Sequence, residues 1–209
     1  MRRIPLAVLI SALFATAALA GGPEHDGAHH GDISKVNRSV HVGDGETAGD
    51  VESVNGSVTI GDHAIVEAAE TVNGSVRIGA NSQAESLETV NGSISVGAKT
   101  VVQEGIDTVN GAITLDEDAA SLDKIETVNG RIELGARAQA GAGIELVNGD
   151  VELKKAASVT GDIVVRDITV DENTVHVQVE VSNPAMHSRK RMEEAVVFNL
   201  QQALGKDVK

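Results

Sequence analysis

Six acidic residues each stand three places before an asparagine, and this arrangement recurs every 18 or 19 residues. If the repeats stack on one another, the carboxylates form a column. Such a column could bind a divalent cation, because hard cations prefer oxygen ligands. It could equally keep the molecule soluble and discourage contact between sheets. The acidic column consists of Glu52, Glu70, Glu88, Asp107, Glu126 and Glu145.

Each of the six asparagines is preceded by valine and followed by glycine. Asparagine tolerates turn or left-handed geometry, and the glycines are expected to adopt corner dihedrals that a Cβ would resist. Amides stacked from coil to coil can also hydrogen-bond one another. We therefore interpret these asparagines as a structural ladder rather than as ligand-binding groups. The asparagine ladder is predicted at Asn55, Asn73, Asn91, Asn110, Asn129 and Asn148.

The histidines offer weaker candidates for chemistry, because the seven of them do not share one position in the repeat. His63 or His176 could act as a base in an enzyme of the hexapeptide acyltransferase type, whose coils are also three-sided. An exported protein would not meet the soluble acyl donors of such enzymes, so we predict no enzyme and no cofactor. A loose transition-metal site is conceivable at His25, His29 and His30 with Glu24, Asp26 and Asp32.

The fixed repeat predicts a solenoid, in which each coil packs only against its neighbours. Within it, an apolar residue occurs at every sixth place from Val36 to Val102, and the series continues with single-residue slips to Val165. Three steps of six per coil indicate a three-sided cross-section of short strands and turns. We expect all of these residues, Val54 and Leu122 included, to face inward. The prediction is an all-β, single-stranded, three-sided β-solenoid of about seven 18–19-residue coils over residues 34–166.

The composition supports a narrow interior and excludes some partners. The chain has two phenylalanines, no tyrosine, no tryptophan and no cysteine, so its core must be aliphatic and free of disulfides. The net charge of −14 argues against nucleic acid and anionic membrane surfaces as partners.

The N-terminus reads as a signal peptide over residues 1–20. Arg2 and Arg3 precede a short apolar run, and Ala18-Leu19-Ala20 fits the small-x-small cleavage rule. An uncleaved anchor is the alternative, although the run is short for a membrane span. We expect cleavage after Ala20, export to the periplasm or cell surface, no integral membrane segment afterwards, and a flexible His/Gly-rich lead-in over residues 21–33.

Residues 167–209 leave the repeat pattern. Alternating valines predict a strand over 174–181, and apolar residues at every fourth place predict an amphipathic helix over 186–204, which could cap the last coil. The basic run Arg189-Lys190-Arg191 is either solvated or in contact with acidic coils of the same or another subunit.

Repeats such as "VNGSVTIG", "VNGSVRIG" and "VNGRIELG" resemble those of the bacterial putative-adhesin β-solenoid family of the head-GIN type. The resemblance covers residues 34–166 and implies an envelope or surface β-helix without known catalytic residues. The coils are also similar to bactofilins, which are cytoskeletal polymers. These expectations leave two main hypotheses: a structural or adhesion module with an unidentified envelope partner, and a scaffold that self-associates end to end.

Overall fold

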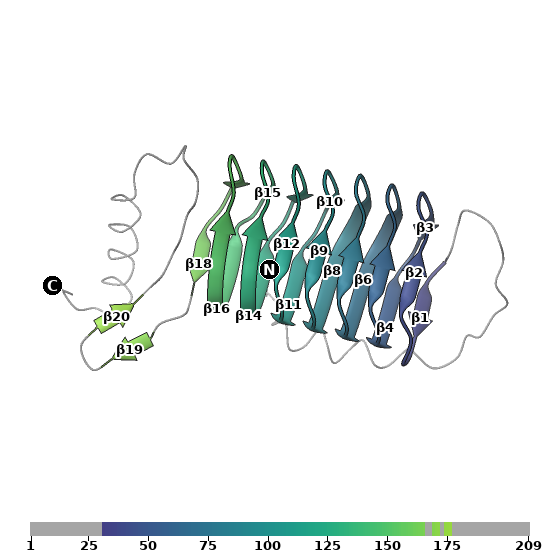
Figure 1. The fold of residues 1–209 in the computed structure, drawn as a ribbon, viewed down its shortest axis with the longest axis horizontal. Coiled ribbons are helices and arrows are strands. Elements are labelled where there is room, and N and C mark those ends of the chain that lie inside the picture. The colour runs from purple at the N-terminus through teal and green to yellow at the C-terminus, as the bar shows by residue number, and fades with distance from the viewer. Residues whose placement is uncertain (1–30, 166–168, 172–173, 177–209) are drawn as a thin grey trace, which may run out of the picture.

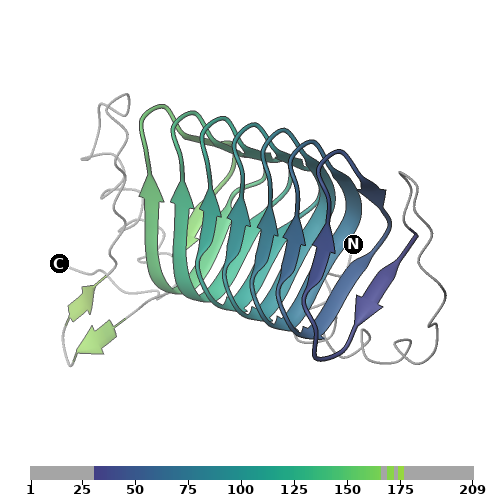
Figure 2. The same cartoon turned by 45° about the vertical axis from the view of Figure 1, so that its right-hand side comes forward.

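The computed structural model describes residues 31–165, 169–171 and 174–176. Residues 31–165 form a parallel β-solenoid of about seven turns, as predicted (Figures 1 and 2). Every paired residue lies 18 or 19 positions from its partner in the next coil, as for Ile33 with Val51 and Ile125 with Ile144. Each coil contributes three strand segments, and equivalent segments stack into three faces.

Face 1 contains the segments that lead toward the asparagines. Its strands are β1 (Ile33–Lys35), β4 (Val51–Asn55), β11 (Ile106–Asn110) and β18 (Ile163–Val165), with parts of the longer strands β6 (Ile65–Asn73), β8 (Gln83–Asn91), β14 (Ile125–Leu134) and β16 (Ile144–Leu153).

Face 2 follows each asparagine-glycine corner, and face 3 follows the next corner. Face 2 contains β2 (Val40–Val42), β5 (Val58–Ile60), β7 (Val76–Ile78), β9 (Ile94–Val96), β12 (Ile113–Leu115) and the ends of β14 and β16. Face 3 contains β3 (Thr47–Ala48), the beginnings of β6 and β8, β10 (Val101–Val102), β13 (Ala120–Ser121), β15 (Gln139–Ala140) and β17 (Ser158–Val159).

The core lies inside the coils and consists mainly of aliphatic side chains. In the inner coils each face turns two residues inward, two places apart in the sequence, because alternate residues of a strand point to opposite sides. In the second coil, face 2 buries Val58 and Ile60, and face 3 buries Ala64 and Val66. The same positions recur in the neighbouring coils, so the interior is a continuous column of small and medium side chains.

One third of the predicted six-step series does not face inward. The valine before each asparagine, such as Val54 or Val90, is half-buried on the outer side of face 1. Val36 and Leu122, two further members of the series, are 53% and 58% exposed. The expectation that the series is wholly internal was therefore wrong. In face 1, strand alternation buries the positions one and three places before the valine instead.

Those inward positions on face 1 include hydroxyl side chains. Thr71, Thr89 and their equivalents are buried, and each hydroxyl donates to a backbone carbonyl of the preceding coil. Thr71 Oγ1 lies 2.8 Å from the Gly56 oxygen, and Thr89 Oγ1 lies 3.0 Å from the Gly74 oxygen. These hydrogen bonds satisfy polar groups that would be costly to bury alone.

The glycines after the asparagines are required by close stacking rather than by corner dihedrals. Of the six, Gly149 alone has a positive φ. A Cβ at Gly92 or Gly111 would overlap the carbonyl oxygen of the equivalent glycine in the preceding coil. None of the six ladder asparagines lies in the left-handed region, whereas Asn37, which begins the ladder in the first coil, has a φ of 58°.

The left-handed residues instead occupy the corner between faces 2 and 3. One residue per coil has a φ between 56° and 71° there, and the equivalent positions are Gly45, His63, Asn81, Lys99, Asp118, Arg137 and Ala156. Glycine, asparagine, aspartate and histidine adopt this geometry more readily than the lysine, arginine and alanine found in the other coils.

After the solenoid, β19 (Thr169–Asp171) and β20 (Thr174–His176) pair antiparallel. The strand predicted over 174–181 is thus described for its first three residues. The predicted signal peptide, the lead-in up to residue 30 and the helix over 186–204 lie outside the described residues. Within the described ranges, no helix has the length and apolar character needed to cross a bilayer.

Candidate functional site

The six predicted acidic residues lie in one row on the outer side of face 1. Register pairs Glu52 with Glu70, Glu70 with Glu88, and Glu88 with Asp107. Glu126 and Glu145 continue the row. Adjacent coils of a parallel sheet are about 4.8 Å apart, so each carboxylate has like-charged neighbours along the stack.

The three middle members of the acidic column, Glu70, Glu88 and Asp107, resist ionisation because their carboxylates are partly buried. Burial, together with the smaller effects of the charges on Glu88, Glu52 and Asp50, raises the pKa of Glu70 to about 7. Burial likewise raises the pKa of Asp107 to about 7, with a contribution from the neighbouring acids. Oε2 of Glu70 is buried and has no hydrogen-bond partner among the described residues. Near neutral pH the middle of the column therefore carries a mixture of protonated and ionised groups.

One lysine compensates the C-terminal end of the column. Lys124 Nζ lies 2.8 Å from Glu126 Oε1 and also contacts Glu145. In residues 31–165, no ion pair joins a basic side chain to the first four acids of the column. The same part of the chain contains no group of three or more ligating side chains placed to hold a metal ion.

A second acidic row lies beside the first, and the sequence analysis missed it. Its members stand three places before the four middle acids of the column, and they are Glu67, Glu85, Glu104 and Asp123. Backbone hydrogen bonds link them from coil to coil, from Glu104 N to Glu85 O at 2.7 Å and from Asp123 N to Glu104 O at 3.1 Å. Glu104 raises the pKa of Glu88, after burial, and Asp123 raises that of Asp107. The repeated three-residue spacing between acids was the signal that could have found this row.

The six predicted asparagines form one ladder with Asn37 at its start. Each Nδ2 donates to the Oδ1 of the asparagine one coil earlier, at 2.8–3.0 Å. Asn91, for example, donates to Asn73 and accepts from Asn110, both at 3.0 Å. Their amides thus bond along the stack and fix the relative position of successive corners.

Replacing an internal rung should cost more than replacing the last one. Asn91→Ala removes two ladder bonds, and we expect it to lower the free energy of unfolding by about 1–2 kcal/mol. Asn148→Ala removes one bond within the described residues, to Asn129, and should cost about half as much. Urea unfolding of both variants measures this difference. Equal midpoints for the two variants would show that the ladder contributes little.

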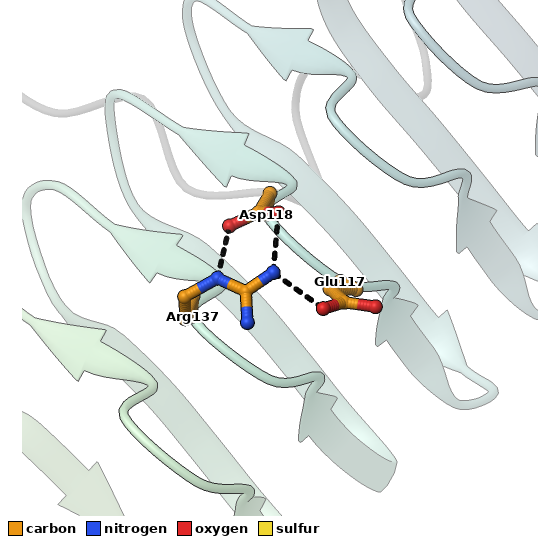
Figure 3. A network of polar contacts seen from close by, with 3 residues as sticks. All are labelled: Glu117, Asp118 and Arg137. Carbon is orange, nitrogen blue, oxygen red and sulfur yellow. Dashed lines mark hydrogen bonds and ion pairs between the residues drawn. The ribbon is translucent and has the colours of Figure 1, made fainter.

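The left-handed corner carries an ion cluster between two coils. Arg137 Nε donates to Asp118 Oδ1 at 2.7 Å, and Nη2 donates to Asp118 Oδ2 at 2.7 Å and to Glu117 (Figure 3). The hydrogen bonds from Arg137 lower the pKa of Asp118.

His63 lies exposed in the same corner, where its stacked equivalents are Gly45 and Asn81. This placement gives no partner for the catalytic role considered above, and the side chain of His176 is not described.

Face 1 differs from the other faces in the uniformity of its outward residues. Its outer side repeats an acid, a valine and an asparagine in each of six coils. The stacked positions on face 2 change in chemical type, as in Thr59, Arg77, Ser95, Thr114, Glu133 and Glu152. Those on face 3 do the same, as in Ile65, Gln83, Val101, Ala120, Gln139 and Ser158. Face 1 is therefore the candidate functional surface.

Comparisons with protein-family models, with curated proteins and with solved structures find no match to this chain.

Proposed function

We propose that this protein is an exported, non-catalytic structural or adhesion module of the bacterial cell envelope, which acts by surface binding or scaffolding. The observation that carries the proposal is the uniform outer side of face 1. A stack of identical acid, valine and asparagine positions offers a linear surface rather than a pocket. Repeat proteins commonly bind through such extended surfaces.

Export is supported by the first 20 residues, whose basic start, apolar run and Ala18-Leu19-Ala20 fit a cleaved signal. The test is to express the full chain in a Gram-negative host and to fractionate the cells. We expect a mature protein that begins at Gly21 in the periplasmic or outer-surface fraction. A cytosolic protein that keeps its first 20 residues would contradict the proposal.

An end-to-end scaffold is the second candidate, and the two ends of the stack favour it. Ile33 in the first coil and Ile163 and Val165 in the last are partly exposed where the core reaches the ends. Exposed strand edges readily pair with another chain. Size measured against concentration separates the two candidates: filaments that grow with concentration support the scaffold, and a constant monomer supports the binding module.

A further inference from the structure

The seven valines that precede the asparagine positions form a continuous apolar row on the outside of face 1. We call this row the valine column. Its members share an outward position where a polar residue would be equally compatible with the strand, yet none of them is polar. The valine column consists of Val36, Val54, Val72, Val90, Val109, Val128 and Val147.

The valine column is flanked by negative charge. Two places before each valine from Val54 onward stands a member of the acidic column, whose first four acids have no ion pair in residues 31–165. An apolar row beside unpaired carboxylates is complementary to a segment that is both aliphatic and basic.

One segment of this chain has that chemistry. Residues 189–191 are the only three consecutive basic residues in the sequence, and Met192, Val196, Leu200 and Leu204 follow at every fourth place. The three basic residues outnumber the two acids that follow them, Glu193 and Glu194. We propose that the valine column is a docking surface for residues 186–204 of the same chain.

The dimensions of the two partners agree. The valine column covers six intervals between coils, or about 29 Å at about 4.8 Å per interval. A helix over residues 186–204 would be about 28 Å long at about 1.5 Å per residue. The segment can therefore lie along the whole column.

The point where the chain leaves the solenoid also favours docking within one molecule. The last strand of the solenoid, β18, pairs with Ile144–Leu146 of β16 on face 1, so Val165 ends the stack on the same face as the valine column. The sequence from His176, where the β19–β20 pair ends, to Arg189 reaches up to about 43 Å when extended, at about 3.3 Å per residue, which is longer than the column.

This inference does not depend on the cellular location, but it assigns the outer side of face 1 to a segment of this chain, so an external partner that binds the same surface must displace that segment. Docking is tested on the full mature chain with a carbodiimide. This reagent joins a lysine amine and a carboxylate in an amide bond, and it takes up the water that is lost and becomes a urea. Peptide mass spectrometry then locates the bonds. We expect Lys190 to couple to acids of the acidic column at least about tenfold more than to Glu133 and Glu152 on face 2, with a yield that is independent of protein concentration.

Variants identify which side chains carry the docking. Glu88→Gln with Asp107→Asn should reduce coupling at the remaining acids of the column severalfold, and Val90→Thr with Val109→Thr should do the same while keeping β-branched residues in the strands. Glu152→Gln on face 2 is the matched control and should leave the yield unchanged. The proposal is overturned by coupling of Lys190 spread evenly over the faces, by its absence, or by a yield that rises with concentration, which would identify a second copy as the occupant.

Discussion

Gly111→Ala is expected to lower the free energy of unfolding by about 3 kcal/mol or more, although it adds only one methyl group. The added Cβ would overlap the carbonyl oxygen of Gly92 in the preceding coil. Neither group can rotate away, since both belong to backbone that is hydrogen-bonded on each side of the corner, with Gly92 N donating to Asn110 O at 3.0 Å. The coils must separate, which weakens stacking above and below the substitution.

Thermal unfolding of the variant measures the effect, and we expect a midpoint lower by about 10 °C. Gly105→Ala is the matched control. A Cβ there has Asp107 Oδ2 as its nearest neighbour at 3.3 Å, the end of a side chain that can move. We expect a change of less than about 1 kcal/mol for this control. Equal losses in the two variants would refute the argument that backbone stacking explains the glycine.

The fold could be predicted from the sequence because every coil of the solenoid repeats the same arrangement of strands and corners. An 18- or 19-residue period with Val-Asn-Gly in each copy leaves few architectures that bury its aliphatic residues. The pairing register followed directly, since equivalent residues such as Asn55 and Asn73 must stack.

The identity of the residues that face the core could be predicted less completely than the fold, because the corners interrupt the alternation of inward and outward residues along the strands. The sequence favoured Val90 over Thr89 for the core on hydrophobicity alone, whereas Thr89 is buried and Val90 lies outside. A buried hydroxyl is acceptable here because the Gly74 carbonyl of the preceding coil accepts its hydrogen bond at 3.0 Å. That partner is known only once the coils are placed against each other.

The candidate site was likewise predicted only in part. The spacing of Glu70, Glu88 and Asp107 predicted their alignment, but their elevated pKa values depend on how deeply the neighbouring side chains bury them. The cluster of Arg137 with Asp118 was not predicted, although the 19-residue step between these opposite charges places them at equivalent positions of adjacent coils.

The second large effect that we expect comes from the acidic column: the free energy of unfolding should fall as the pH rises from about 4 to about 7. Glu70 and Asp107 have a pKa near 7 in the folded protein, against about 4 in an unfolded chain. The folded state therefore holds protons that the unfolded state has already released. Because the unfolded state binds fewer protons in this range, the free energy of unfolding falls with increasing pH and levels off above about pH 7.

The size of this loss is limited by solvent, since both side chains are only partly buried. A shift of one pKa unit corresponds to about 1.4 kcal/mol, and screening reduces the effect for partly exposed groups. We expect about 1–2 kcal/mol for each of Glu70 and Asp107. Thermal melting at constant ionic strength should thus give a lower midpoint at pH 8 than at pH 5.

Asp107→Asn isolates the cause of this pH dependence. The amide keeps the size of the carboxyl group but cannot ionise, so the variant should be more stable than the parent at pH 8 and should lose part of the difference between pH 5 and pH 8. Asp150→Asn is the control, because Asp150 lies outside the column with its side chain 62% exposed and pairs only loosely with Arg131, at 3.6 Å. A parent protein that is more stable at pH 8 than at pH 5, or an Asp107→Asn variant destabilised at pH 8, would mean that the column is stabilised by its charge through bound cations rather than strained by it.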